Sequence, residues 1–313
     1  MSNTSTTIEI RRLSACSFDE AVKIWNEGFQ GYFVDLTMSL DRYISRLHRE
    51  GLSPEFSFLA FCEGRPVGFL LNGIRQSAGR KAAWNGGTGV TPEFRGRGIG
   101  KALMRATLDL YNELGVDVAM LEAISANEPA IALYQQFGYE IVDRLVFLQH
   151  EGHLGEQSFF RPNSQSYSVE SVAPYAVGEL EFYQDLAPWQ AQWQSLARQK
   201  GEALIVSDVN GAPVGYALYK QTCDEQGRTV EVALYQCAAG PGSDTEAVVG
   251  CALRTLYAPF EYECKRSTYN FIKSNEVVCM MLDEAGFAPF IEQVHMVRWS
   301  GLCTKTNSLS PSK

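Results

Sequence analysis

The chain has 313 residues, a formal net charge of −9 and a hydrophobic fraction of 45%. This length suits two domains that each bury a core of their own. The acidic balance argues against nucleic acid as a partner, and the sequence has no apolar run long enough to predict a membrane span.

The first half of the chain alternates between strand and helix patterns. Residues 8–13 alternate with period two and predict a strand. Ser17, with Glu20 three residues later, predicts the capped start of a helix. The further expected elements are a helix at 40–49, a hairpin of strands at 56–62 and 67–74, a strand at 81–90, a helix at 101–114, a strand at 116–123, a helix at 128–137 and a strand at 141–149.

A glycine-rich turn joins the expected strand at 81–90 to the helix that follows. It reads Arg95-Gly96-Arg97-Gly98-Ile99-Gly100-Lys101. Glycines let a backbone approach a ligand closely, and successive amides at a helix N-terminus form a concavity with partial positive charge. The turn therefore predicts a site for one phosphate or two. It lacks the Lys-Ser or Lys-Thr of a P-loop, and it lies too far along the chain for a dinucleotide turn.

The Arg-x-x-Gly-x-Gly spacing of this turn resembles the acetyl-CoA pyrophosphate loop of the GNAT N-acetyltransferases. Residues 121–139 resemble the fifth strand and fourth helix of the same family, at the expected distance downstream. The resemblance covers about residues 7–150. It implies an α/β (α+β) fold with a central mixed, mostly antiparallel sheet flanked by helices. It also implies acetyl-CoA as acyl donor, a primary amine of a small molecule or peptide as acceptor, and no metal.

The resemblance assigns roles to individual positions. Amides of the turn would hold the pyrophosphate, and the backbone of Val90 would donate to the thioester oxygen. Asn127 would contact the pantetheine arm, although capping the helix that begins at Glu128 also explains it. Tyr134 would be the general acid for the leaving thiolate, with aromatic core packing as the alternative. The expected cofactor-binding residues are Val90, Arg95, Gly96, Arg97, Gly98, Ile99, Gly100, Lys101 and Asn127.

The general base has two candidates. Many family members carry an acidic residue on the strand before the turn, where this chain has Gly86 and Gly87; that departure would widen the site. Glu122, on the next strand, resembles the proposed base of ribosomal-protein N-terminal alanine acetyltransferases. A buried carboxylate there would have a raised pKa and could relay a proton through water. A salt-bridged strand residue explains Glu122 as well, and a water chain reaching bulk solvent could replace it.

The acceptor pocket is expected between the first two helices, where Phe29, Tyr32, Phe33 and Asp35 lie. An aromatic wall with one carboxylate suits a cationic amine that carries an apolar group. Core packing explains the aromatic residues equally well.

The second half repeats the first. Residues 64–68 match residues 211–215 at an offset of 147 (211 − 64), and Asn127 matches Asn275 at an offset of 148 (275 − 127). The second half therefore predicts another domain of the same fold. Its turn is lost, because residues 245–250 place a glutamate and two valines opposite the glycine-rich turn. Leu282 stands opposite Tyr134, so the hydroxyl is lost too.

We therefore expect a catalytic GNAT domain at residues 1–150, a linker at 151–170, a degenerate GNAT-like domain at 171–303 and a disordered tail at 304–313. The degenerate domain would be structural, dimer-forming or substrate-shaping, and the tandem arrangement resembles mycothiol synthases. The alternative function is an acyl-CoA sensor without turnover, which the missing strand carboxylate motivates. Tyr134 argues against a sensor, since pure binding needs no leaving-group acid.

The eight cysteines contain no Cys-x-x-Cys pair, and the four histidines are scattered. Free thiols in a reducing cytoplasm are therefore expected, with no metal site. Residues 1–7 have neither the basic flank nor the apolar centre of a secretory signal. The sequence thus predicts a cytoplasmic protein that engages neither a membrane nor a nucleic acid, with a homodimer as one alternative for its oligomeric state.

Overall fold

A computed structural model describes residues 7–162 and 167–300 of the chain. The tail expected at 304–313 lies outside the described residues. The chain forms two compact units, and each is assembled from separate pieces of sequence. The first contains Met1–Ala123, Asn127–Ile141 and Met296–Lys313, and the second contains Ile124–Ala126 and Val142–His295. The division into domains at 1–150, 151–170 and 171–303 stays a prediction, since these units cut the chain at other points.

The first unit is built on a mixed sheet. Its strands are β1 (Ile8–Arg12), β2 (Phe58–Cys62), β3 (Arg65–Ser77), β4 (Arg80–Val90) and β5 (Val118–Ile124), and its helices are α1 (Phe18–Gly28), α2 (Leu40–Glu50), α3 (Ile99–Glu113) and α4 (Glu128–Gln136). The strands follow the order β1-β2-β3-β4-β5. Pairing is antiparallel from β1 to β4 and parallel between β4 and β5.

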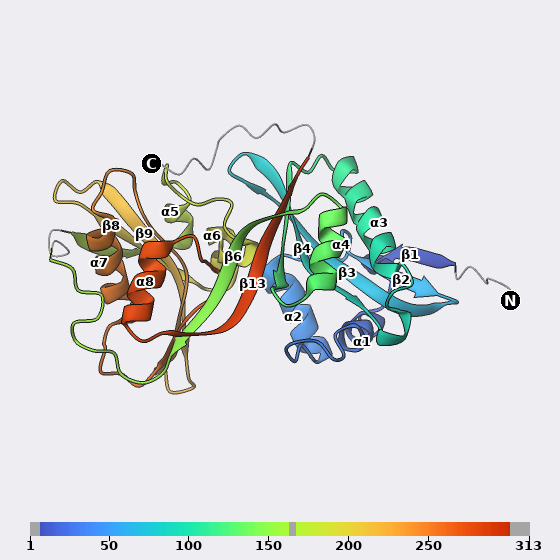
Figure 1. Cartoon of the computed structure of the whole chain (residues 1–313), viewed down its shortest axis with the longest axis horizontal. Coiled ribbons are helices and arrows are strands. Elements are labelled where there is room, and N and C mark those ends of the chain that lie inside the picture. Colours follow the sequence, from blue (N-terminus) through green and yellow to red (C-terminus); the bar gives the residue numbers. More distant parts are fainter. Residues whose placement is uncertain (1–6, 163–166, 301–313) are drawn as a thin grey trace. The chain divides into compact units, whose positions relative to one another are not determined.

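Helices cover both faces of this sheet (Figure 1). An added Cβ at Gly87 would lie 3.0 Å from Trp25 of α1, whereas one at Gly68 would lie 3.0 Å from Ile99 of α3. Successive strand residues point to opposite faces, and the pairing of Leu71 with Gly87 and of Gly68 with Val90 puts these contacts on opposite sides. The helix α1 begins at a complete capping box between Ser17 and Glu20, as expected from the sequence.

The strands β4 and β5 separate towards the glycine-rich turn. Their pairing joins Ala82–Asn85 to Val118–Leu121, while β4 itself continues to Val90. The register between β3 and β4 shifts at Gly86, which bulges out of the ladder. The separation places the end of β4 beside α4, where the candidate site lies.

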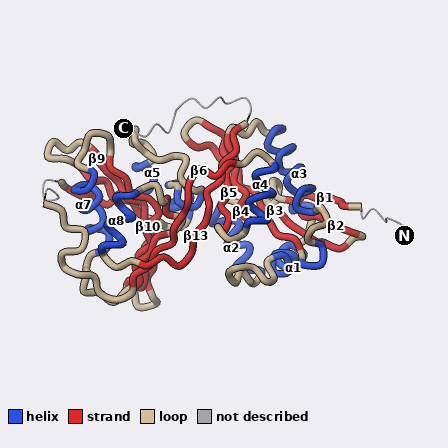
Figure 2. Tube along the Cα trace, viewed as in Figure 1, coloured by secondary structure: helices blue, strands red, loops and turns tan. Residues whose placement is uncertain are grey.

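The second unit repeats this plan. Its strands are β6 (Glu140–His150), β7 (Ser168–Val172), β8 (Glu202–Ser207), β9 (Pro213–Cys223), β10 (Thr229–Ala239), β11 (Lys265–Thr268), β12 (Phe271–Ile272) and β13 (Ala288–Trp299), and its helices are α5 (Pro174–Val177), α6 (Trp193–Arg198), α7 (Thr245–Tyr257) and α8 (Glu276–Glu284). The strand order is β13-β6-β11-β10-β9-β8-β7, and β12 pairs with β6. Figure 2 shows the strands of both units in red. The parallel pair of this unit is β10 with β11, the counterpart of β4 with β5.

The closing strands explain why the units interleave in sequence. The strand β6 ends the first half of the chain but pairs with β11 in the second unit, where Arg266 faces His150. The chain end after β13 returns to the first unit, where Ser300 N–H donates to the carbonyl of Asp117 at 2.9 Å. The first half therefore contributes its last strand to the sheet of the second unit, and the residues after His295 belong to the first unit.

Within residues 7–162 and 167–300, no helix has both the length and the apolar character needed to cross a bilayer. The cysteines at 16, 62, 223, 237, 251, 264 and 279 are free thiols.

Candidate active site

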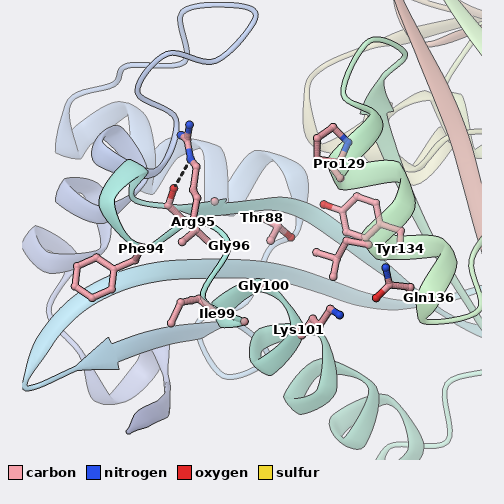
Figure 3. A pocket seen from close by; sticks show the side chains of 15 residues that line it. Thr88, Phe94, Arg95, Gly96, Ile99, Gly100, Lys101, Pro129, Tyr134 and Gln136 are labelled. Atoms are coloured by element: carbon pink, nitrogen blue, oxygen red, sulfur yellow. Dashed lines mark hydrogen bonds between the residues drawn. The ribbon is translucent and has the colours of Figure 1, made fainter. Parts of the chain in front are cut away.

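A cavity of about 400 Å³ lies between the end of β4, the glycine-rich turn and α4 (Figure 3). Its volume falls within the range of small-ligand sites. The lining residues are Thr88, Gly89, Val90, Phe94, Arg95, Gly96, Gly98, Ile99, Gly100, Lys101, Pro129, Ala130, Leu133, Tyr134 and Gln136. The cavity thus joins the predicted phosphate turn to the predicted general acid within one unit.

The turn has the backbone that an anion site needs. Gly96 and Gly98 adopt φ values of 75° and 84°, in the left-handed region that favours glycine. Gly98 is the N-cap of α3 and supplies no side chain to cap it. The first helical hydrogen bond runs from the amide of Ala102 to the carbonyl of Gly98 at 3.0 Å. Amides before Ala102 therefore have no partner inside the helix and are available to an anionic ligand.

Arg95 has a different contact from the one expected. Its guanidinium donates to the carbonyls of Val90, Gly28 and Gln30 at 3.0, 3.1 and 3.0 Å. Figure 3 shows the bond to Val90. Arg95 therefore fixes the end of β4 against the end of α1, and it lines the cavity while its charge faces backbone carbonyls.

Of the other two basic residues of the turn, Lys101 lines the cavity and Arg97 does not. Lys101, in the first turn of α3, lines the cavity. Arg97 lies with its guanidinium carbon 5.1 Å from the centre of the Phe94 ring and is not among the lining residues. Lys101 is thus better placed than Arg97 to meet a phosphate inside the cavity.

Tyr134 is buried on α4 and reaches across the cavity towards β4 (Figure 3). Burial raises the pKa of its phenol to about 12, and hydrogen bonding to Thr88 opposes this rise. The Thr88 hydroxyl also bonds to the amide of Asn85, with donor and acceptor 2.9 Å apart. Tyr134 therefore keeps its proton at neutral pH and can donate a hydrogen bond into the cavity.

Asn127 serves as the N-cap of α4. Its side-chain oxygen accepts a bond from the amide of Ala130 at 3.3 Å. Burial raises the pKa of the Tyr32 phenol, and hydrogen bonding to Asn127 opposes this rise. The capping interpretation is therefore confirmed. Asn127 also connects α4 to Tyr32, which lies in the segment between α1 and α2. Contact with the pantetheine arm stays a prediction.

Glu122 lies on β5 and is oriented by a tryptophan. The indole Nε1 of Trp84 donates to its carboxylate at 2.7 Å. Trp84 is buried on β4, and this bond crosses from β4 to β5 in their paired region. The bond fixes one carboxylate oxygen of Glu122, which itself lies outside the set of residues that line the cavity.

The expected widening of the site at Gly86 and Gly87 is wrong. A Cβ at Gly86 would come within 2.6 Å of Trp84 and 2.7 Å of Leu52, and one at Gly87 within 3.0 Å of Trp25. The space that a carboxylate would need is therefore filled by indole rings and a leucine. The glycines are required by this packing.

The segment between α1 and α2, where the acceptor pocket was expected, brings three aromatic rings into successive contact. The ring centres of Phe29 and Tyr32 are 5.0 Å apart, and those of Tyr32 and Phe33 are 5.2 Å apart. Phe33 is 54% exposed, so its ring is accessible to a ligand. Asp35 accepts a bond from the amide of Thr37 at 2.9 Å, and this bonding lowers its pKa.

Several cavity residues were not predicted from the sequence. Thr88, Phe94, Leu133 and Gln136 line the cavity. Period-two alternation along β4 could have selected Thr88, since it lies two residues before Val90. No local pattern marks Gln136 as a lining residue. Among the described residues, no cluster of three or more histidine, cysteine or acidic side chains could hold a metal.

Comparisons with known proteins agree with this geometry. The Acetyltransferase (GNAT) family matches residues 18–139. N-alpha-acetyltransferase 30 of Schizosaccharomyces pombe is 30% identical over 110 residues, which are 34% of this chain and 70% of that protein. N-alpha-acetyltransferase 30 of Dictyostelium discoideum is 32% identical over 92 residues, or 29% of this chain and 50% of that protein. The chain thus spans about half the length of the latter relative.

The chain belongs to the GNAT family of acetyltransferases. Its particular type is the tandem GNAT protein, with two units of related fold. A tandem GNAT protein from the clavulanic acid biosynthesis pathway superposes with a TM-score of 0.55 at 14% identity, over 94% of this chain and 99% of that one. The expected fold class is therefore confirmed.

Proposed function

We propose that this protein transfers an acetyl group from acetyl-CoA to a primary amine of a small molecule or peptide, in the first unit. The observation that carries this proposal is the single cavity joining a glycine-rich turn to the buried phenol of Tyr134. Relatives named N-alpha-acetyltransferase support an α-amine as the acceptor. Acetyl-CoA would supply the acetyl group as a thioester.

The turn would hold the donor. Amides between Gly96 and Lys101 lie where an anion can accept from them, and the ammonium of Lys101 adds a full charge. The backbone of Val90 lines the same cavity and would polarise the thioester carbonyl. Arg95 would preserve that position indirectly, because it bonds the Val90 carbonyl to the end of α1.

Proton movements would fall to Tyr134 and Glu122. The amine nitrogen bonds to the acetyl carbon, the carbon–sulfur bond breaks, the nitrogen loses one proton and the sulfur gains one. Tyr134 would donate to the sulfur as the thiolate forms. Glu122 would take the amine proton through water, with Trp84 fixing its orientation.

The phenol pKa of about 12 exceeds that of an ordinary thiol, about 8.5. Donation from Tyr134 is therefore favourable only when it is coupled to loss of the amine proton.

Activity would be tested with an amine panel that contains peptides with free α-amines and small polyamines, by following release of the coenzyme thiol. We expect release of the coenzyme thiol to depend on the amine, and its rate to fall about 10²-fold in Tyr134→Phe. Tight binding of acetyl-CoA with only slow, amine-independent thioester hydrolysis would instead support an acyl-CoA sensor. A cytoplasmic location and a homodimer stay predictions.

A further inference from the structure

The second unit holds a segment of its own chain at the positions that match the first unit's cavity. When the second half is aligned with the first by α7 and α3, matching residues lie 150 positions apart. Gly250 then matches Gly100, and Glu246 matches Gly96 (250 − 100 = 246 − 96 = 150). When α8 is aligned with α4, matching residues lie 148 positions apart, and Glu284 matches Gln136 (284 − 136 = 148). The three first-unit residues line the candidate acetyl-CoA cavity, so their counterparts mark the equivalent groove between α7 and α8.

Residues 157–162, here called the strap, cross this groove. A Cβ added to Gly250 would lie only 2.6 Å from the carbonyl oxygen of Phe159 and 3.2 Å from Cγ of Arg161. The strap backbone therefore lies directly on α7. Phe159 is 3% exposed, and its ring centre lies 5.7 Å from that of Tyr257 and 6.5 Å from that of Phe287. Its side chain anchors the strap in the core of the second unit.

Arg161 ties the strap to both helices. Its Nε donates to Glu246 on α7 at 3.1 Å, and its Nη2 donates to Glu284 on α8 at 2.8 Å. Hydrogen bonding to Glu284 is the main cause of its raised pKa. Only 19% of the Arg161 side chain is exposed. A guanidinium thus lies between two carboxylates where, in the first unit, amides and a lysine would meet phosphate.

A hydrogen bond crosses the path expected for pantetheine in the second unit. Asn275 is the counterpart of Asn127, and its Nδ2 donates to the carbonyl of Cys237 at 2.6 Å. Cys237 matches Thr88, because β10 and β4 begin and end at an offset of 149 (229 − 80 = 239 − 90). A side-chain bridge therefore joins α8 to β10 at the level where Tyr134 faces Thr88 in the first unit.

We propose that the strap is a built-in occupant of the second unit's groove, which closes that groove to coenzyme A. The inference rests on the proposed function for the identity of the excluded ligand. The groove itself has the opposite charge to a phosphate site, since Glu246 and Glu284 would repel the anion that Lys101 attracts. The strap pairs with these two carboxylates and covers α7 at Gly250. A cavity of about 360 Å³ remains beside the strap, and the carboxylate of Glu246 in its lining disfavours a phosphate. The lining residues are Arg161, Pro162, Asp244, Thr245, Glu246, Ala247 and Val277.

Hydrogen exchange on the full chain without ligand tests the strap directly. In the Glu246→Gln/Glu284→Gln double variant, amides in peptides that cover 157–162 should exchange about tenfold faster, because two ion pairs that hold the strap are lost. Glu276→Gln/Asp283→Asn removes two exposed carboxylates from α8 and is the matched control, with unchanged exchange expected. Equal exchange in the test variant and the wild-type protein would overturn the proposal.

A second arm adds desulfo-CoA to the wild-type chain. Protection of peptides that cover 95–101, with none in 157–162 or 245–250, is the expected result. Protection at 245–250 would overturn the inference, because the groove would then accept the coenzyme. Protection of neither region would contradict the proposed function of the first unit, while the ligand-free comparison would still decide whether Arg161 holds the strap.

Discussion

The helices α3 and α7 are counterparts in the two units, but the backbone amides at their N-termini have different hydrogen-bond partners. The helix α3 begins after Gly98, which offers no side-chain cap, whereas α7 begins after Asp244, whose carboxylate accepts from the amide of Ala247 at 3.1 Å. The bond from the Val248 amide to the Asp244 carbonyl then adds a helical turn where the first unit has an open loop. The amides before Ala102 in the first unit thus have no partner inside the helix, whereas the second unit caps the amide of Ala247 with Asp244.

This comparison shows how the start of one helix can differ between two units of related fold. An N-cap side chain stabilises a helix by about 1 kcal/mol, so the second unit gains local stability that the first forgoes. Glycines at positions 96 and 98 keep the first turn open, because their φ values disfavour other residues. The glutamate and valines that replace this turn extend the helix, and the strap then covers it.

Phe159→Ala should cause the largest change in stability. Loss of a buried aromatic side chain from the second core costs about 3–5 kcal/mol, measured as the free energy of unfolding in urea. Phe160→Ala is the matched control, since Phe160 is an exposed neighbour in the strap. Similar destabilisation by both variants would contradict the anchoring role of Phe159.

Tyr134→Phe should lower kcat/KM about 10²-fold and leave the affinity for desulfo-CoA unchanged, because only the proton donor is removed. Tyr139→Phe is the control, since this buried ring lies 6.1 Å from Tyr134 and its hydroxyl has no hydrogen-bond partner within the described chain. Full activity in Tyr134→Phe would exclude the phenol from the chemistry.

Gly98→Ala should weaken desulfo-CoA binding by about 1–2 kcal/mol, because alanine disfavours a left-handed backbone. Gly211→Ala imposes the same strain in the second unit, where φ is 81°. Calorimetry should find the affinity of this control unchanged. Equal weakening in both variants would mean that the turn is not the binding element.

Trp84→Phe should lower kcat/KM near pH 7 by less than about tenfold, because the indole that donates to the Glu122 carboxylate and orients it is lost. The affinity for desulfo-CoA should stay unchanged in calorimetry, since Glu122 does not line the cavity. An unchanged kcat/KM would show that orientation of Glu122 by Trp84 plays no part in the reaction.

The smallest effect is expected for alkaline pH. Tyr134 retains its proton because burial raises its pKa to about 12, so kcat/KM should rise as the amine deprotonates and should not decline before about pH 10. Its raised pKa also means that its contribution to stability is complete below pH 10 and is lost as the pH approaches 12. A decline near pH 8 would show that another acid is required.

Local patterns predicted the elements of the first half well. The Ser17–Glu20 capping box and the helix at 40–49 were confirmed, and α3 begins at Ile99, two residues before the expected start at 101. These features depend on neighbours within one helical turn. The glycine-rich turn also pointed to the cavity, because its glycines lie together in sequence.

Long-range contacts could not be predicted in the same way. The partners of Arg161 lie 85 and 123 residues away, and the polar stretch around it was expected to be a linker. Arg95 was expected at a phosphate, but its carbonyl partner in α1 lies 67 residues upstream. The pairing of β6 with β11 likewise joins distant segments of the chain. No local periodicity encodes such contacts.

Calorimetric titration of desulfo-CoA into the full chain counts the coenzyme sites that are open to a ligand. We expect one binding site per chain, whose affinity Gly98→Ala weakens and the Glu246→Gln/Glu284→Gln variant leaves unchanged. Two sites in the wild-type chain would show that the second groove is open, and an absence of binding would contradict the assignment of the first cavity to acetyl-CoA.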